Sequence, residues 1–351
     1  MAKRILPIVM DVNFNRMAII DSYKSLIWTT RYYDHGDFEL QIAANPANVS
    51  LLTTGNYIVR DDDENVGIIE KVDLTISETN EMLMKVSGRF LTAILARRIV
   101  AEQTAFQNDY VSNIIESLLD DAIINPELPE RAISNFTINP YEIASSLDVQ
   151  YTGKNLYTII SDLALQYHFG FKIILNDSNQ FVFSLYEGTD RSYNQSSNPY
   201  VIFSDEYENL INAEFQKDTK GMVTAVLAAG EGEGLDRKTI WVQSAEAPTG
   251  INRYEYYDDS RNTSSNEGEI PEEKYYNQLA EDGRASLTTY ESTFAGEVNF
   301  TAITFKKDVD IGDIVTIESK ALGYKLAARI IEVIESVDAS GAYSVIPTFG
   351  T

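Results

Sequence analysis

The strongest constraint on the fold is a set of short runs in which apolar and polar residues alternate, separated by turn-forming residues. This period of two is typical of strands with one buried face, and Asp, Asn, Gly and Pro in the separators favour tight turns. Residues 1–105 are therefore predicted to form a compact β domain, a barrel or a sandwich. The alternating runs are 17–20, 38–42, 66–76 and 82–86, and the turns are 34–36, 45–46, 55–56 and 61–64.

The middle of the chain changes to a helical period. Apolar residues recur at three- and four-residue spacing over 111–123 and again over 156–167, which predicts two amphipathic helices. Two strand-like runs, 171–175 and 180–186, follow on either side of a polar hairpin loop. We therefore predict a small α/β domain here, which ends near the polar stretch 191–198.

Strand patterns return after residue 200 and continue to the end, with one interruption. The interruption holds a tyrosine- and acid-rich segment at 254–259, a linker-like stretch at 260–268, and a predicted helix that starts at Pro271. Glu272 and Glu273 suit the positive N-terminal end of that helix.

Part of the β pattern is repeated within the chain. Gly36–Leu40, Gly55–Val59 and Ile68–Glu70 are echoed in the same order by the three later segments Gly296–Phe300, Gly312–Val315 and Ile330–Glu332. Two interpretations stay open. Acidic β proteins can repeat such short motifs by chance, or the same barrel occurs twice in this chain.

The charge balance makes the chain a poor candidate for binding nucleic acid. The chain has 53 Asp and Glu against 28 Lys and Arg, a net charge of −25, whereas proteins that grip nucleic acid do so with Lys and Arg. Residues 201–300 alone hold 20 acidic against 8 basic residues. The excess acid serves either solubility or a surface that must not adhere to a polyanion.

Catalytic signatures are missing from the sequence. There is no cysteine, the two histidines His35 and His168 stand alone, and neither HExxH nor GxSxG occurs. The glycine-rich run Gly230–Gly234 carries two glutamates and lacks the Lys-Ser/Thr of a phosphate loop, so we interpret it as an acidic turn. No catalytic or cofactor-binding residue is predicted.

Two acidic clusters are candidate cation sites, namely Asp61–Glu64 and the trio Asp308, Asp310 and Asp313. Neither has the EF-hand order of ligands, glycine and terminal glutamate. Exposed turns are the favoured interpretation, and no metal ligand is predicted.

Several short motifs follow one another in a fixed order along the whole chain. They are Trp28, Tyr32, Gly36 and Phe38–Leu40 near the start, and Gly188–Ser192, Val201–Ser204, Asn209, Leu210, Asp310–Val315, Arg329, Ile330 and Ile346–Gly350 later. Together these motifs resemble a siphophage tail-hub family of the ReqiPepy type. Family members resemble the N-terminal structural module of tail-associated lysins and the hub of contractile-phage baseplates.

The resemblance implies an α+β, mostly β chain with two similar β-barrels and two smaller insertions. The first barrel is then 1–105, the second is 196–250 with 292–351, and the insertions are 106–195 (α/β) and 251–291 (a small tip insertion with a helix). It further implies a homotrimeric ring that closes the tail tube, assembled in the bacterial cytoplasm and located at the virion tail tip.

The partners implied are the distal tail protein, tail tube proteins, and tip fibre or receptor-binding proteins. DNA would pass through the channel without specific binding, and no membrane span is expected. Relatives often continue into a peptidoglycan-cutting domain, whereas this chain ends at Thr351, so no enzyme activity is expected. The alternatives are a cell-wall hydrolase and a carbohydrate-binding adhesin, the latter suggested by Tyr254–Tyr257.

Overall fold

A computed structural model describes residues 5–76, 81–288, 291–298 and 303–350 and is mostly strand, as predicted. Its α-helices are α1 (Pro46–Leu51), α2 (Val111–Leu119), α3 (Leu156–Tyr167) and α4 (Glu272–Ala285). Asn155 caps α3 by accepting hydrogen bonds from the backbone N–H groups of Tyr157 and Thr158. None of the helices in the described ranges is both long and apolar enough to cross a membrane.

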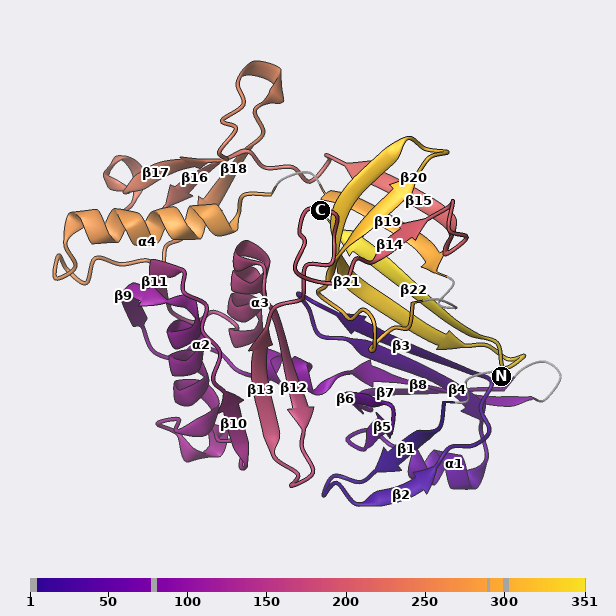
Figure 1. The fold of residues 1–351 in the computed structure, drawn as a ribbon. Helices are drawn as coiled ribbons and strands as arrows, with labels where there is room; N and C mark the ends of the chain where they lie inside the picture. Colours follow the sequence, from indigo (N-terminus) through magenta and orange to yellow (C-terminus); the bar gives the residue numbers. More distant parts are fainter. Residues whose placement is uncertain (1–4, 77–80, 289–290, 299–302, 351) are drawn as a thin grey trace.

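One ten-stranded sheet connects the two ends of the chain (Figure 1). Its main path runs β15–β19–β22–β21–β3–β4–β8–β7, and every neighbouring pair on this path is antiparallel. β20 and then β14 extend the sheet from β21. The bounds are β3 (Ser25–Arg31), β4 (Asp37–Ala43), β7 (Lys71–Ile76), β8 (Met82–Arg89), β14 (Ile202–Ser204), β15 (Leu210–Asp218), β19 (Glu291–Val298), β20 (Ile314–Ser319), β21 (Tyr324–Val337) and β22 (Tyr343–Gly350).

A smaller sheet, β2–β1–β5–β6, packs against the first part of the large sheet. It consists of β1 (Pro7–Met10), β2 (Arg16–Ile19), β5 (Tyr57–Arg60) and β6 (Asp63–Ile68). Between the two sheets lies a core that contains the fully buried Trp28, Phe38 and Phe90.

The order of strand pairing is used twice. The first half pairs β3–β4–β8–β7 with β5 against β6, and the second half pairs β15–β19–β22–β21 with β20 against β21. In both halves a glycine with positive φ, Gly55 or Gly312, donates its N–H to the carbonyl oxygen of Ile69 or Ile330. When the strand pairs are followed from this hydrogen bond across each half, residues at equivalent positions in the two halves can be matched. They are Val72 and Val333, Val86 and Pro347, Phe38 and Phe294, and Trp28 and Phe215.

Two sequence expectations need correction. No closed barrel is seen in the described ranges, because β3 pairs with β21 and so joins both halves into one open sheet. The first segment of the internal repeat is out of register. The sequence matched Gly36–Leu40 with Gly296–Phe300 and so Phe38 with Val298, whereas strand pairing aligns Phe38 with Phe294. Asn299 and Phe300 of the later segment lie outside the described residues.

Two insertions complete the fold. The first holds α2, α3, a sheet β10–β13–β12, and the pair β9–β11, which share one apolar core. The second is the sheet β17–β16–β18 covered on one face by α4. The bounds are β9 (Thr104–Tyr110), β10 (Phe136–Asn139), β11 (Ser146–Tyr151), β12 (Gly170–Leu175), β13 (Phe181–Tyr186), β16 (Ala225–Ala229), β17 (Thr239–Gln243) and β18 (Glu255–Asp259).

Candidate functional site

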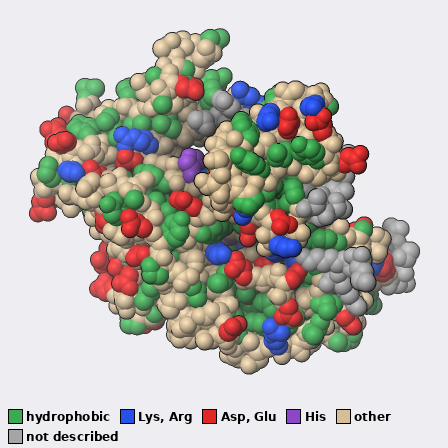
Figure 2. Space-filling model, in the orientation of Figure 1, with side chains coloured by type: hydrophobic (Ala, Val, Ile, Leu, Met, Phe, Trp, Pro, Cys, Tyr) green, Lys and Arg blue, Asp and Glu red, His purple; other side chains and the backbone are tan. Residues whose placement is uncertain are grey.

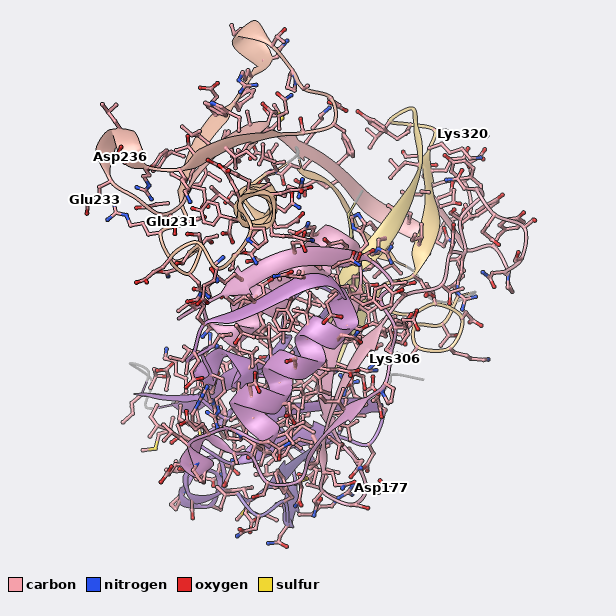
Figure 3. All side chains as sticks on the ribbon, turned by 90° about the vertical axis from the view of Figure 1, so that its left-hand side faces the viewer. Asp177, Glu231, Glu233, Asp236, Lys306 and Lys320 are labelled. Carbon is pink, nitrogen blue, oxygen red and sulfur yellow. The ribbon has the colours of Figure 1, made fainter. Side chains whose placement is uncertain are left out.

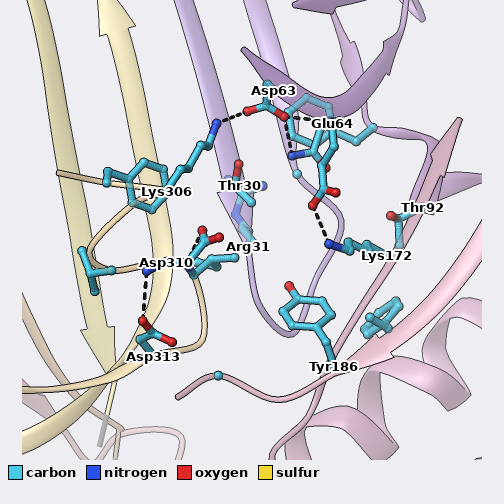
Figure 4. Close-up of a pocket in the computed structure, with 18 of the residues that line it drawn as sticks. Thr30, Arg31, Asp63, Glu64, Thr92, Lys172, Tyr186, Lys306, Asp310 and Asp313 are labelled. Carbon is cyan, nitrogen blue, oxygen red and sulfur yellow. Dashed lines mark hydrogen bonds and ion pairs between the residues drawn. The ribbon is translucent and has the colours of Figure 1, made fainter. Parts of the chain in front are cut away.

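A charged cleft of about 790 Å³ lies where the first β region, the first insertion and the second β region meet (Figure 4). Its walls come from the end of β3, the turn before β6, the strands β12 and β13, and residues 305–313. On the molecular surface, Figure 2 shows acidic and basic side chains interspersed over the middle of one face. The cleft is therefore polar and faces solvent between three parts of the chain.

Both predicted acidic clusters contribute to this cleft, although they lie far apart in the sequence. Residues 61–64 line one wall, and Asp310 and Asp313 line another. Basic side chains pair with them: Lys306 contacts Asp63, and Lys172 contacts Glu64 (Figure 4). Among the residues described, no group of three or more acidic or histidine side chains is placed to hold a metal ion.

A buried ion pair lies behind the cleft. The Arg60 Nη1 atom donates to Glu335 Oε2 at 2.7 Å, and the two side chains are 0% and 2% exposed. Arg60 also donates to both oxygens of Asp62 at 2.9 Å and lies over the Trp28 ring. Burial would raise the pKa of Glu335, but the charges of Arg60 and Lys306 outweigh it and lower that pKa to about 2. This pair ties β5 to β21.

Two of the motifs that carry the resemblance pack against each other at the cleft. Asp313 accepts hydrogen bonds from the Thr189 N–H at 2.7 Å and from Arg191 Nε at 2.8 Å. A Cβ atom at Gly188 would lie 1.9 Å from the carbonyl oxygen of Gly312. The glycine and the aspartate are therefore needed to dock the segment that follows β13 onto the second β region.

Burial raises the pKa of Asp310, which a general acid would require. The carboxylates of Asp63, Glu64 and Asp313 in the same cleft are engaged by Lys306, Lys172 and Arg191. The cleft chemistry is that of an ion-pair brace between parts of the chain.

The two histidines lie at structural positions. His35 packs on the Tyr157 ring with centroids 5.1 Å apart. His168 ends α3 in the left-handed region at φ 61°, and its carbonyl oxygen accepts from the Tyr32 hydroxyl at 3.1 Å. Burial and the nearby Arg329 charge lower the pKa of His168.

The glycine-rich run is an acidic turn after β16, far from the cleft (Figure 3). Glu231 in this turn accepts from Lys238 Nζ at 2.6 Å and from the Ser265 hydroxyl at 2.6 Å. Burial alone would raise the pKa of Glu231, but these contacts outweigh it and lower that pKa to about 2. The turn is held by its own ion pair and offers no cradle for a phosphate.

An exposed aromatic face lies on the β17–β16–β18 sheet, on the side away from α4. Leu227 lies opposite both Trp241 and Tyr257 in the strand register, and each of these rings is 50% exposed. Arg253 lies over the Trp241 ring at 5.1 Å. The sequence pointed to Tyr254–Tyr257 but missed Trp241, which joins Tyr257 on this face only through strand pairing of both with Leu227.

Sequence reasoning also missed Arg60, Lys306 and Glu335. The available signal was a charged residue inside an otherwise apolar strand, such as Arg60 after Tyr57–Val59. A buried charge needs a partner, but its identity depends on a contact between positions 60 and 335.

Comparison with known proteins gives both a family and a fold. The family described as Siphovirus ReqiPepy6 Gp37-like protein matches residues 6–351. No curated protein sequence matches the chain.

Three solved structures with a similar fold are tail proteins. The tail protein from Neisseria meningitidis MC58 has a TM-score of 0.58 at 12% identity, covering 99% of this chain and 96% of that one. Prophage tail protein gp18 from Listeria monocytogenes EGD-e has a TM-score of 0.56 at 14% identity, covering 99% and 94%. The 43 kDa tail protein of prophage MuSo2 from Shewanella oneidensis has 0.56 at 13%, covering 99% and 97%.

Proposed function

Because the chain belongs to the family of Siphovirus ReqiPepy6 Gp37-like proteins and has the fold of phage tail proteins, it is a structural tail protein, and we propose that it is the tail hub. The family match confirms the resemblance predicted from the sequence. In the proposal, three copies form a ring that closes the tail tube at the virion tip. The ring joins the distal tail and tube proteins above to fibre or receptor-binding proteins below.

The observation that carries the hub proposal is the repeated strand order within one continuous sheet. A chain with two similar halves can present six similar units from three copies, which suits a ring placed between sixfold and threefold neighbours. We propose the two halves as residues 1–105 and 196–250 with 292–351, and 106–195 and 251–291 as insertions that face the tip. Within 196–250, the strands β16 and β17 belong to the second insertion, because they form one sheet with β18.

The net charge of −25 supports a channel that DNA crosses without binding. Carboxylates on a channel wall repel phosphates over distances near the screening length of about 8 Å at physiological salt. Basic walls would instead create points of adhesion.

Imaging of the assembled particle tests the hub. Antibody-labelled particles should carry the protein at the tail tip, and a reconstruction should show three copies around a channel. One or six copies at the tip, or label along the tube, would contradict the proposal.

We also propose that the protein is not an enzyme. The ion pairs of the cleft support this, because the carboxylates of Asp63, Glu64 and Asp313 are engaged with Lys and Arg. Zymography on bacterial cell walls is the measurement, and a clearing band that survives repurification would contradict it.

The exposed aromatic face of Trp241, Leu227 and Tyr257 favours a second candidate, an adhesin that binds carbohydrate. Aromatic rings at a surface with a polar rim suit such contacts. Binding of cell-wall polysaccharide that is lost in Trp241→Ala would support it, and unchanged binding would exclude this face.

A further inference from the structure

Two strand edges terminate the main path of the large sheet in the described part of the chain, β7 at one end and β15 at the other. Val72, Leu74 and Ile76 alternate along β7, opposite Val86, Met84 and Met82. Leu74 is 55% exposed and Ile76 is 67% exposed. An apolar strand edge of this kind is a template for another strand.

The chain contains a completed version of the contact that this edge lacks. β21 pairs antiparallel with β3 over six residue pairs, from Glu332 opposite Arg31 to Val337 opposite Leu26. In the repeat, the second half of β21 corresponds to β7, and β3 corresponds to β15. The equivalent contact of β7 with β15 is not made within the described part of the chain, where these two strands are the ends of an open path.

We propose that β7 of one copy pairs antiparallel with β15 of the next copy, in the register of the internal β21–β3 junction. This contact rests on the ring assembly proposed above and names the surfaces that would form it. The register places Lys71 opposite Asp218, Asp73 opposite Gln216, Leu74 opposite Phe215, and Thr75 opposite Glu214.

One of these pairs, Lys71 with Asp218, carries opposite charges. In the internal junction, Arg31 Nε donates to Glu332 Oε2 at 2.7 Å. The equivalent pair between copies is Lys71 with Asp218, which keeps opposite charges and exchanges their signs. Like charges placed directly opposite would be destabilising, so this agreement supports the register.

The apolar side chains agree as well. Leu74 would lie beside Phe215, which packs against the Tyr324 ring with centroids 4.4 Å apart. The exposed Leu74 would thus be covered by an aromatic side chain that already packs against the apolar core of the second β region. The contact removes apolar surface from water on both copies.

The direction of the strands permits this pairing. Eight successive antiparallel strands leave β7 and β15 running in opposite directions, so a neighbouring copy in head-to-tail contact brings them together antiparallel. Two different edges make a heterologous interface, which closes into a ring when the rotation between copies allows it.

Disulfide cross-linking in assembled particles tests the register, because the chain has no cysteine of its own. Thr75→Cys with Glu214→Cys places two exposed residues opposite each other and should link neighbouring copies under mild oxidation. Thr75→Cys with Asp218→Cys is the matched control. Its two positions share a face but are four residues apart along the strands, about 13 Å, which is beyond disulfide reach.

A mixture of two single variants, Thr75→Cys and Glu214→Cys, should give linked dimers and no longer species. Particles that contain the protein but show no link, or that link equally in the control, would overturn the interface and leave the tail location standing. Links in purified oligomers of a chain absent from tail tips would overturn the location and leave the interface standing.

Discussion

The closed β21–β3 junction and the open β7 and β15 edges occupy equivalent places in the two halves of the molecule, but their chemistry differs. At the closed junction, Glu335 lies opposite Trp28, and both are almost fully buried. At the open edge the equivalent of Glu335 is Leu74, which is more than half exposed.

The difference follows from when each contact forms. A buried carboxylate is tolerable only beside a permanent partner, and Arg60 of the same chain is always present for Glu335. A leucine can stay exposed at small cost and becomes stabilising once covered. Charge is thus placed at the contact within the chain and apolar surface at the contact proposed between copies.

The largest expected effect is at the closed junction. Arg60→Met should destabilise the fold by roughly 3–5 kcal/mol, because it leaves Glu335 buried without its main charge partner. Urea unfolding followed by tryptophan fluorescence measures the loss. The control is Arg16→Met, whose exposed pair with Asp61 should be worth about 0–1 kcal/mol. Equal losses in both variants would contradict the contrast.

Acid should weaken the same junction. The pKa of Glu335 is lowered from 4.5 to about 2 in the fold, so its contribution is complete above pH 4.5 and is lost as pH falls toward 2. The full contribution is roughly 3 kcal/mol, of which about 2 kcal/mol should be gone by pH 3.

Glu335→Gln isolates this contribution. The difference in unfolding free energy between the parent and this variant should shrink as pH falls from 7 to 3. A difference that stays constant with pH would show that the Glu335 charge does not stabilise the fold.

A charge at the open edge should act on assembly and leave the fold intact. Leu74→Asp should change the unfolding free energy by no more than about 0.5 kcal/mol. It should weaken association between copies by roughly 10- to 100-fold, because the contact would bury an unpaired carboxylate. Sedimentation equilibrium measures this.

The control for Leu74→Asp is Val12→Asp, at an exposed apolar residue of the first β region that is not part of β7 or β15. It should assemble normally. Loss of assembly in both variants would point to a general effect of added charge.

Local pattern predicted much of this fold. The helical period over 156–167 corresponds to α3, and Pro271 precedes α4 as expected. These features depend on neighbours in sequence, so residues such as Asn155 and Glu272 carry the signal themselves. The family resemblance depended on motifs such as Gly188–Ser192, whose packing against Gly312 and Asp313 explains their residue types.

Contacts between residues far apart in the chain could not be predicted from the sequence. The sequence gives no way to pair Arg60 with Glu335, or to see that β3 joins β21 instead of closing a barrel. Similar short motifs revealed the internal repeat. Its first segment was matched out of register, because register is set by cross-strand partners such as Phe38 and Gly88.

The smallest effect should give the most specific test of the register. Lys71→Glu alone, or Asp218→Lys alone, should weaken association by about two- to threefold, since an exposed cross-strand ion pair is worth roughly 0.5 kcal/mol. The two changes together restore opposite charges with the signs of the internal Arg31–Glu332 pair and should recover the parent affinity. Lys71 already contacts Asp73 within its own chain at 2.7 Å, which reduces the effect of the single change. Raising the salt concentration should narrow the gap in affinity between the single variants and the parent, because it screens both the repulsion in the singles and the ion pair in the parent. A double variant weaker than both singles would contradict the proposed pairing of Lys71 with Asp218.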